Sequence, residues 1–292
     1  MKIHLSPGSK IKFTIVLAAA SALAAAASAQ VLTTESFAIS SGAGGSGGAQ
    51  TSDMIFSDGT SWSGGAVGLQ GASGFNNLSG HTAAANVSFK YNLGATVDSL
   101  NNTYGAGNWT VANTKLTFQY TLYANNSRFN AGAGGFNIYW VGNDNWTQGT
   151  ANPAYATSES ALAAWAGSDA LLGSEYYNWT TPSYTGTYAD LGTSAWVTDK
   201  TGARQSTLSY GLGLDSSFVS DILSASASSD PNLSLYLMPT SDSLGLCIFT
   251  GGGGSLPTLT FDVVAAPEPS AMAMSVFGLA GFVAVRRWKN QK

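Results

Sequence analysis

The stretch that most constrains the fold is Lys115–Tyr123, in which apolar and polar side chains alternate along the chain. Its apolar members are Leu116, Phe118, Tyr120 and Leu122, and the polar residues between them are Thr117, Gln119 and Thr121. Successive side chains of a β-strand point to opposite faces of the sheet, so a period of two is typical of a half-buried strand. We therefore predict that this segment lies in a sheet with one face toward a core.

The same alternation recurs at residues 87–91, 136–140, 208–214, 233–237 and 259–263, where strands are predicted. Residues 33–39 give a further strand candidate, and residues 54–56 and 66–69 are predicted as short strands separated by turn residues. Only two segments suggest helix: the alanine-rich Ser158–Leu172, and a short turn at residues 218–222 that Asp215 or Ser216 would cap. Many strands with regular turns and few helices predict an all-β fold, an antiparallel β-sandwich of jelly-roll type.

Several short motifs mark the body of the chain. They are Trp146-Thr147-Gln148-Gly149, the segment Tyr177–Pro182, the tryptophan-led segment Trp196–Thr201, the closing Pro257-Thr258-Leu259 and an earlier, degenerate Lys90–Leu93. From Lys115 to Val263, just over half of the chain, they resemble the DNRLRE-type jelly-roll domains of bacterial surface proteins. The resemblance implies the same sandwich. Because some relatives are carbohydrate-binding modules, it also implies glycan binding.

Residues 1–29 have the three parts of a secretory signal peptide. Lys2, Lys10 and Lys12 form a basic region, Phe13–Ala27 is apolar, and Ala27-Ser28-Ala29 is a small-residue cleavage site. We expect signal peptidase to cleave between Ala29 and Gln30. The alternative is an N-terminal membrane anchor that stays attached.

Residues 267–292 carry a second membrane-directed segment. The uncharged stretch Ala271–Val285 would form a helix of roughly 23 Å, short against a hydrocarbon core of about 30 Å, and Ser270 and Trp288 extend it into both interfaces. The basic residues that follow would hold the C-terminus on the cytoplasmic side. We expect a single transmembrane helix, for which a simple anchor or a buried helix with a basic end is the plainer alternative.

A proline box precedes this apolar segment. Pro267-Glu268-Pro269, the apolar helix and the basic pair Arg286-Arg287 with Lys289 together resemble the PEP-CTERM sorting signal of bacterial exported proteins. The resemblance implies recognition by an exosortase, a membrane protease, and association with exopolysaccharide or biofilm matrix. The chain is thereby divided into a signal peptide at 1–29, an exported β-sandwich domain at 30–266 and a sorting signal at 267–292.

The exported domain is acidic. Residues 30–266 contain five basic and fifteen acidic residues, a formal net charge of −10. Such a domain cannot neutralise phosphates, so nucleic acid is excluded as a partner. Cys247 is the only cysteine of the chain, which excludes an internal disulfide, and its apolar neighbours predict that it is buried.

The usual catalytic motifs are missing. The one histidine of the exported domain, His81, lies in a polar turn, and no Gly-x-Ser-x-Gly, His-Glu-x-x-His, Walker or Cys-x-x-Cys motif is present. A glycoside hydrolase needs only two carboxylates, for which Glu159 and Glu175 are candidates because each lies near aromatic residues. We predict a protein that is not an enzyme, with a glycan-degrading enzyme as the alternative.

Aromatic residues are concentrated in the least regular part of the domain. The candidates for contact with a glycan are Trp146, Trp165, Tyr176, Tyr177 and Trp179. Their flat apolar faces suit sugar rings, and nearby Asn and Asp groups can bond hydroxyls. The alternative is that they pack in the core, which we favour for Trp109 and Trp140.

Calcium is the ligand that the acidic loops would take, because it prefers clustered oxygen donors. Asp144, within Gly142–Asn145, is the best single candidate, although no EF-hand spacing is present. No other cofactor is expected.

These patterns predict an exported bacterial protein, membrane-anchored before processing and then located at the cell surface or in the extracellular matrix. We expect it to bind exopolysaccharide. The alternatives are a structural or adhesive protein with no small ligand, and the secreted enzyme.

Overall fold

The computed structural model describes residues 30–39, 52–62, 66–72, 84–121, 132–147, 154–177, 205–250 and 256–266. It divides into two compact units, residues 33–263 and residues 1–32 with 264–292. In the second unit the Ala265 amide donates a 3.3 Å hydrogen bond to the Gln30 carbonyl. Within the ranges given above, no helix has both the length and the apolar character needed to cross a membrane.

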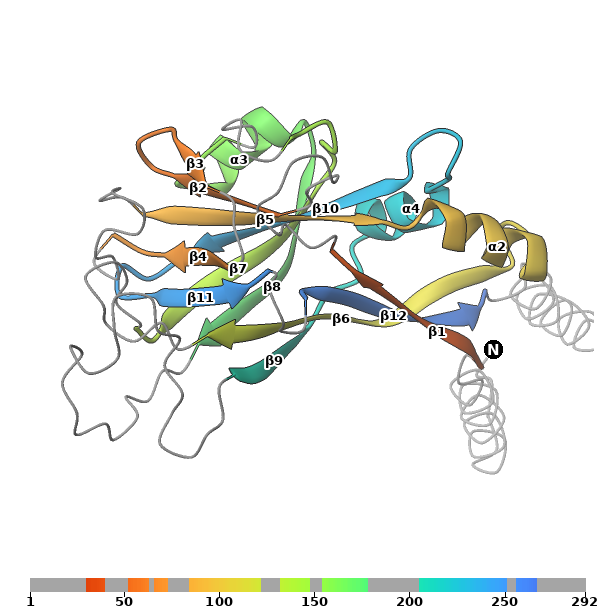
Figure 1. The fold of residues 1–292 in the computed structure, drawn as a ribbon. Helices are drawn as coiled ribbons and strands as arrows, with labels where there is room; N and C mark the ends of the chain where they lie inside the picture. The colour runs from red at the N-terminus through yellow and green to blue at the C-terminus, as the bar shows by residue number, and fades with distance from the viewer. Residues whose placement is uncertain are drawn as a thin grey trace, which may run out of the picture. The chain divides into compact units, whose positions relative to one another are not determined.

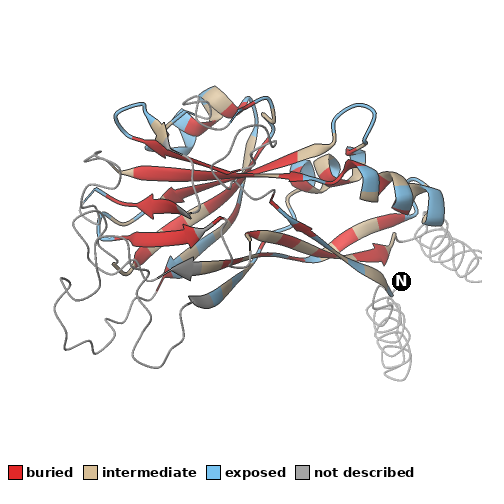
Figure 2. Ribbon diagram, in the orientation of Figure 1, coloured by how far each residue is buried: buried red, intermediate tan, exposed pale blue. Residues whose placement is uncertain are grey.

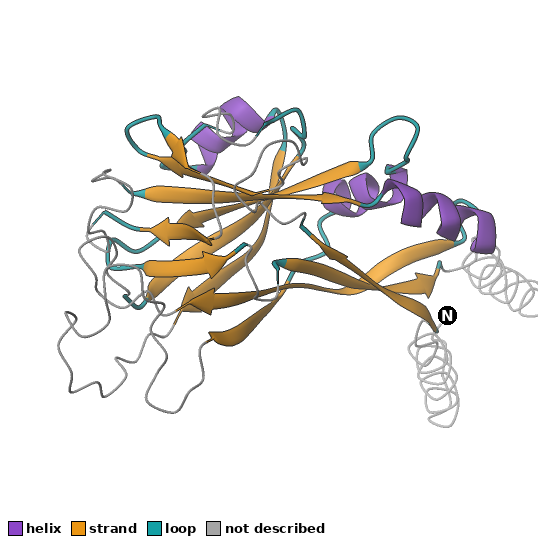
Figure 3. Ribbon diagram, in the orientation of Figure 1, coloured by secondary structure: helices purple, strands orange, loops and turns teal. Residues whose placement is uncertain are grey.

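The described chain consists mostly of strands, with a few short helices (Figure 3). In order they are β1 Val31–Ala38, β2 Ser52–Phe56, β3 Ser61–Trp62, β4 Ala66–Gln70, β5 Ala85–Asn92, α2 Gly94–Tyr104, β6 Trp109–Thr121, β7 Gly134–Val141, α3 Glu159–Ala166, β8 Asp169–Tyr177, β9 Gln205–Gly211, α4 Ser216–Ser224, β10 Asn232–Pro239, β11 Gly245–Phe249 and β12 Thr258–Ala265. The all-β prediction is confirmed.

The strands pair in the order β1-β12-β6-β11-β4-β5-β10-β7-β8, with β2 beside β5, β3 beside β2 and β9 beside β6. In Figure 1, β2, β5 and β10 lie on one side and β6 and β12 on the other. The rings of Phe136 on β7 and Tyr210 on β9 meet edge to face at 5.3 Å, although these strands are not hydrogen-bonded neighbours. This antiparallel arrangement with facing strands is consistent with a β-sandwich.

The core lies between the facing strands, and burial extends along most of them (Figure 2). Phe89, Leu235 and Trp140 form one row across β5, β10 and β7 and are all buried. The opposite face of the same strands is also covered, because α3 and the segment before it pack there. Lys115–Tyr123 was predicted to lie in a strand and does so as far as Thr121, within the longer β6.

The helices show where local pattern and tertiary structure differ. The helix predicted over Ser158–Leu172 is correct only to Ala166, because Gly167 adopts a φ of 72° and the chain then enters β8. Asp215 caps α4 as predicted, accepting a 2.8 Å bond from the Ser217 amide. α2 was not predicted, since the sequence around it shows little apolar periodicity.

Candidate functional site

Part of one sheet face remains open to solvent beside α3. We call it the outer strip and define it by Gly135 and Asn137 on β7, Ser174 and Tyr176 on β8, and Thr240 after β10. Gly135 pairs with Tyr176, and Asn137 pairs with Ser174. The Thr240 amide donates to the Gly135 carbonyl at 2.9 Å. Paired residues share a face, so the strip crosses the ends of three strands.

The outer strip combines one aromatic ring with amide and hydroxyl groups. Tyr176 is 63% exposed, the most of any large hydrophobic residue that the structure describes. Beside it the Ser174 hydroxyl donates to Asn137 Oδ1 at 2.9 Å, and Asn137 Nδ2 donates to the Tyr139 hydroxyl at 3.0 Å. This network fixes the polar groups next to the ring.

Gly135 keeps the middle of the strip flat. A Cβ at this position would lie 2.6 Å from Thr240 Oγ1, closer than ordinary contact. The Thr240 hydroxyl therefore lies over Gly135, in the space that a side chain at this position would need. The strip is a platform rather than a cleft.

A cavity of about 360 Å³ with both polar and apolar lining residues adjoins the strip at Thr240. Asn86 on β5 lines it and is completely buried. Asn86 Nδ2 donates to the Ala156 carbonyl at 2.8 Å and to the Tyr236 hydroxyl at 2.6 Å, whereas Asn86 Oδ1 has no hydrogen-bond partner. A buried acceptor without a partner thus lies in a residue that lines the cavity.

The rim of this cavity is held by the segment before α3. The Tyr236 hydroxyl donates to the Ala154 carbonyl at 2.9 Å and accepts from the Ala156 amide at 3.1 Å. These bonds place Tyr155 at the cavity. Burial, with a smaller contribution from Asp242, raises the pKa of Tyr155, so its phenol stays protonated and can donate.

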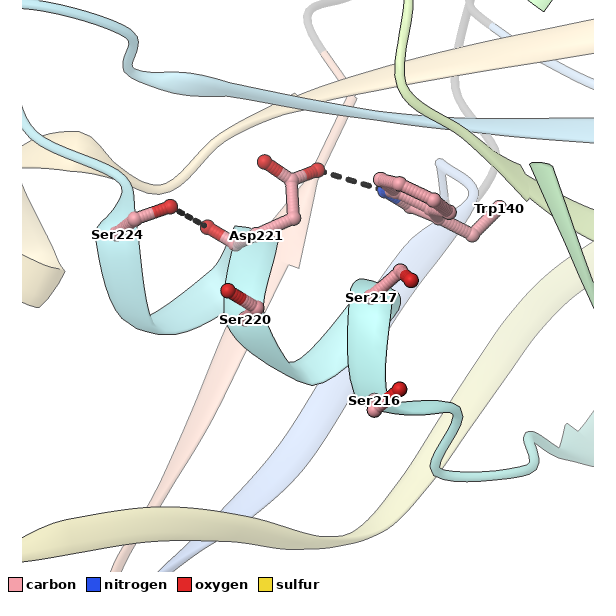
Figure 4. Close-up of a pocket in the computed structure, with 6 residues that line it drawn as sticks. All are labelled: Trp140, Ser216, Ser217, Ser220, Asp221 and Ser224. Carbon is pink, nitrogen blue, oxygen red and sulfur yellow. Dashed lines mark hydrogen bonds between the residues drawn. The ribbon is translucent and has the colours of Figure 1, made fainter. Parts of the chain in front are cut away.

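A second depression, of about 400 Å³, lies beside α4 (Figure 4). Trp140 Nε1 donates to Asp221 Oδ2 at 2.6 Å, and hydroxyls of α4 line the remainder. Burial has the largest effect on the pKa of Asp221 and raises it. The hydrogen bond from Trp140 lowers this pKa, and the negative charge of Asp230 raises it. Because Trp140 is buried and its N–H is already bonded, it offers no free ring face here.

Asp144 belongs to a bonded cluster that fixes the loop after β7. The Ser234 hydroxyl donates to Asp144 Oδ1, and Trp146 Nε1 donates to Ser234 Oγ at 2.8 Å. Lys90 Nζ donates to the carbonyls of Asp144 and Trp146, each at 2.6 Å, and lies 4.5 Å from the centre of the Trp146 ring. Burial raises the pKa of Asp144 to about 6 and lowers that of Lys90.

The five aromatic candidates have different positions. Tyr176 lies on the outer strip, whereas Trp146 and Tyr177 are only 2% and 4% exposed. Trp165 is half-buried, with its ring centre 6.1 Å from that of Tyr236. Burial removes Trp146 and Tyr177 as stacking surfaces, because packed neighbours cover their rings. Trp179 lies outside the described residues.

Trp109 and Trp140 are buried, as predicted. So is Cys247, and burial raises the pKa of its thiol to about 12.

The carboxylate candidates do not share a cleft. Glu159 begins α3, on the outer face of the sheet. Burial raises the pKa of Asp169, and the charge of Glu159 adds a smaller rise. Glu175 precedes Tyr176 on β8 and therefore points to the opposite face.

In the part of the chain that the structure describes, no group of three or more His, Cys, Asp or Glu side chains is placed to hold a metal ion, and Asp144 is instead bonded to Ser234.

The proposed processing signals lie largely outside the described residues. These are Ala27 and Ala29 of the cleavage site and Pro267, Glu268, Pro269, Arg286 and Arg287 of the sorting motif. Gln30 is described and is exposed. His81 also lies outside.

Sequence reasoning missed the cavity. The only feature of the sequence that could have indicated it is Asn86, a polar residue within a strand. Alternation alone assigns such a residue to the solvent-exposed face. No protein-family model and no curated protein matches the chain.

Proposed function

We propose that the exported domain, residues 30–266, binds polysaccharide through the outer strip as a non-enzymatic component of the cell surface or extracellular matrix. The observation that carries this proposal is Tyr176, an aromatic side chain 63% exposed on a flat sheet face beside fixed amide and hydroxyl groups. An exposed ring of this kind is not needed for the core and suits the apolar face of a sugar.

The polar neighbours supply the directional part of recognition. Asn137 and Ser174 form the next pair on the same face, two residues along β7 and β8 from Gly135 and Tyr176. A sugar stacked on the Tyr176 ring would therefore reach them with its hydroxyls. A flat platform suits an extended chain better than a small compact ligand, because it contacts several units weakly rather than one tightly.

The proposed location of the protein rests on the sequence signals at the two ends of the chain. We propose export after cleavage by signal peptidase, a transmembrane helix within 267–292, and recognition of that tail by an exosortase. We also propose that the sandwich is of jelly-roll type. Support comes from its strand order, in which β12 lies between β1 and β6, and β10 between β5 and β7.

The test is retention of the detergent-solubilised full chain on a panel of insoluble polysaccharides. Tyr176→Ala should lower the affinity for the retained glycan about tenfold, the size expected for losing one aromatic contact. Leu171→Ala is the matched control, because Leu171 lies on the same strand and is 46% exposed. Equal binding by Tyr176→Ala and wild type, or no retention on any glycan, would contradict the proposal.

A further inference from the structure

The Lys90 side chain reaches from β5 to the loop that follows β7. Its ammonium nitrogen, Nζ, donates hydrogen bonds to the carbonyl oxygens of Asp144 and Trp146, each at 2.6 Å. The same nitrogen lies 4.5 Å from the centre of the Trp146 ring, within the range of a cation–π contact. Two carbonyl oxygens and one aromatic face of the loop therefore contact a single positive charge.

Lys90 is partly buried, so its ammonium group has lost part of its hydration. Burial is the main cause that lowers the pKa of Lys90, and the negative charges of Asp144 and Asp230 act in the opposite direction. A partly buried charge is stable only where polar groups replace the lost water. The two carbonyl oxygens do this by direct hydrogen bonds, and the two carboxylates do it through their charge.

Carbonyl and carboxylate oxygens are also the ligands that calcium prefers, and Asp144 was the sequence-based candidate for calcium. In the structure, the carbonyls of Asp144 and Trp146 accept hydrogen bonds from Lys90. The Asp144 carboxylate accepts a hydrogen bond from the Ser234 hydroxyl. The position that a bound cation would take beside these carbonyls is thus filled by an ammonium group of the chain itself.

We infer that this position is a site for a primary ammonium group, filled in the native protein by Lys90, and that calcium does not bind the loop after β7. An ammonium has three N–H donors, and here two of them bond to the carbonyls. Calcium takes about six to eight oxygen ligands and would first have to displace the Lys90 ammonium. A free primary ammonium should bind at the same position once the Lys90 side chain is shortened.

The test is chemical rescue of Lys90→Ala in the detergent-solubilised full chain, followed by thermal melting. The substitution should lower the melting temperature by several degrees, because two carbonyls lose charge-assisted hydrogen bonds. n-Propylammonium has the atoms that the substitution removes, from Cγ to Nζ, and should recover about half of the loss or more. n-Propanol, which has no charge, and tetramethylammonium, which has no N–H donor, should not recover it.

Lys115→Ala is the matched control, because Lys115 is an exposed lysine on β6 and n-propylammonium should leave this variant unchanged. If Lys90→Ala does not fold alone, the yield of folded protein on refolding with each additive replaces the melting temperature. No recovery with n-propylammonium, or equal recovery with n-propanol, would overturn the inference. So would a rise in the melting temperature of wild type, when calcium replaces EDTA, that Asp144→Asn abolishes.

Discussion

Replacing Asp144 with asparagine should stabilise the protein above pH 6. The carboxylate is largely enclosed, and burial is the main cause that raises its pKa from the ordinary 3.8 to about 6, with Asp221 and Asp230 adding to the rise. The hydrogen bonds around the Asp144 side chain do not require it to be negatively charged. An amide keeps an acceptor for the Ser234 hydroxyl, and Lys90 is bonded to backbone carbonyls rather than to the carboxylate.

The magnitude follows from proton linkage. A pKa raised on folding means that the native state holds its proton more tightly than the unfolded state, so stability falls as pH rises from about 4 to about 6 and the loss is complete above that. At 1.36 kcal/mol per pH unit, a rise from 3.8 to about 6 corresponds to about 3 kcal/mol. Partial exposure of Asp144 and loss of its attraction to Lys90 reduce the expected gain to about 1–2 kcal/mol.

The assay is urea unfolding of wild type and Asp144→Asn between pH 4 and pH 8. The stability difference between the two proteins should be small near pH 4, grow in favour of the variant through pH 6, and then stay constant. Asp262→Asn is the control of opposite sign, because hydrogen bonds from Asn113 and Thr34 lower the pKa of Asp262. Its carboxylate stabilises the native state above the unfolded pKa, and that contribution is lost as pH falls.

Two results would refute the reasoning about Asp144. One is a variant less stable than wild type at pH 7.5, which would mean that the charge contributes more through Lys90 than burial costs. The other is a stability difference that does not change between pH 4 and pH 7, which would mean that Asp144 titrates normally.

Three further substitutions test the packing. Trp146→Ala should destabilise the protein by about 3–5 kcal/mol in urea unfolding, because it empties a buried site and removes the bond to Ser234, yet leave glycan affinity unchanged. Ser158→Ala should cost about 1 kcal/mol by the same measurement through loss of the α3 cap. Gly94→Ala should lower the melting temperature by several degrees, since a Cβ there would lie 2.6 Å from the Ala227 amide nitrogen. An unchanged melting temperature would show that the backbone around Ala227 shifts to make room for the added Cβ.

The strands were predictable because their core-facing residues recur at a period of two. The prediction of a half-buried strand at residues 87–91 was wrong, because both faces of the sheet are covered there and β5 is buried at every position from Ala85 to Phe89. Alternation reports which residues face the main core, and it carries no information on a second layer that packs from outside. The same limit explains Asn86 and Ser88, polar residues that are nonetheless buried.

The helix error over Ser158–Leu172 has a local cause. Alanine and leucine favour helix up to Ala166, but Gly167 at positive φ ends it, and pairing with β7 takes the next residues into β8. Tyr176 and Tyr177 were both aromatic candidates, and the sequence could not separate the exposure of Tyr176 from the burial of Tyr177. That difference depends on which face of β8 meets the core, which is set by register and not by composition.

The position of the outer strip follows from the length of α3. This helix covers the end of β7 that carries Tyr139 and Val141, which are buried, and leaves the end with Gly135 and Asn137 partly exposed. The apolar residues of the face lie under the helix, and the glycine and asparagine lie beyond it. A single exposed ring such as Tyr176 is compatible with folding alone, because isolated apolar side chains are common on protein surfaces. The binding of Tyr176→Ala therefore decides whether this uncovered end takes a ligand, and its exposure does not.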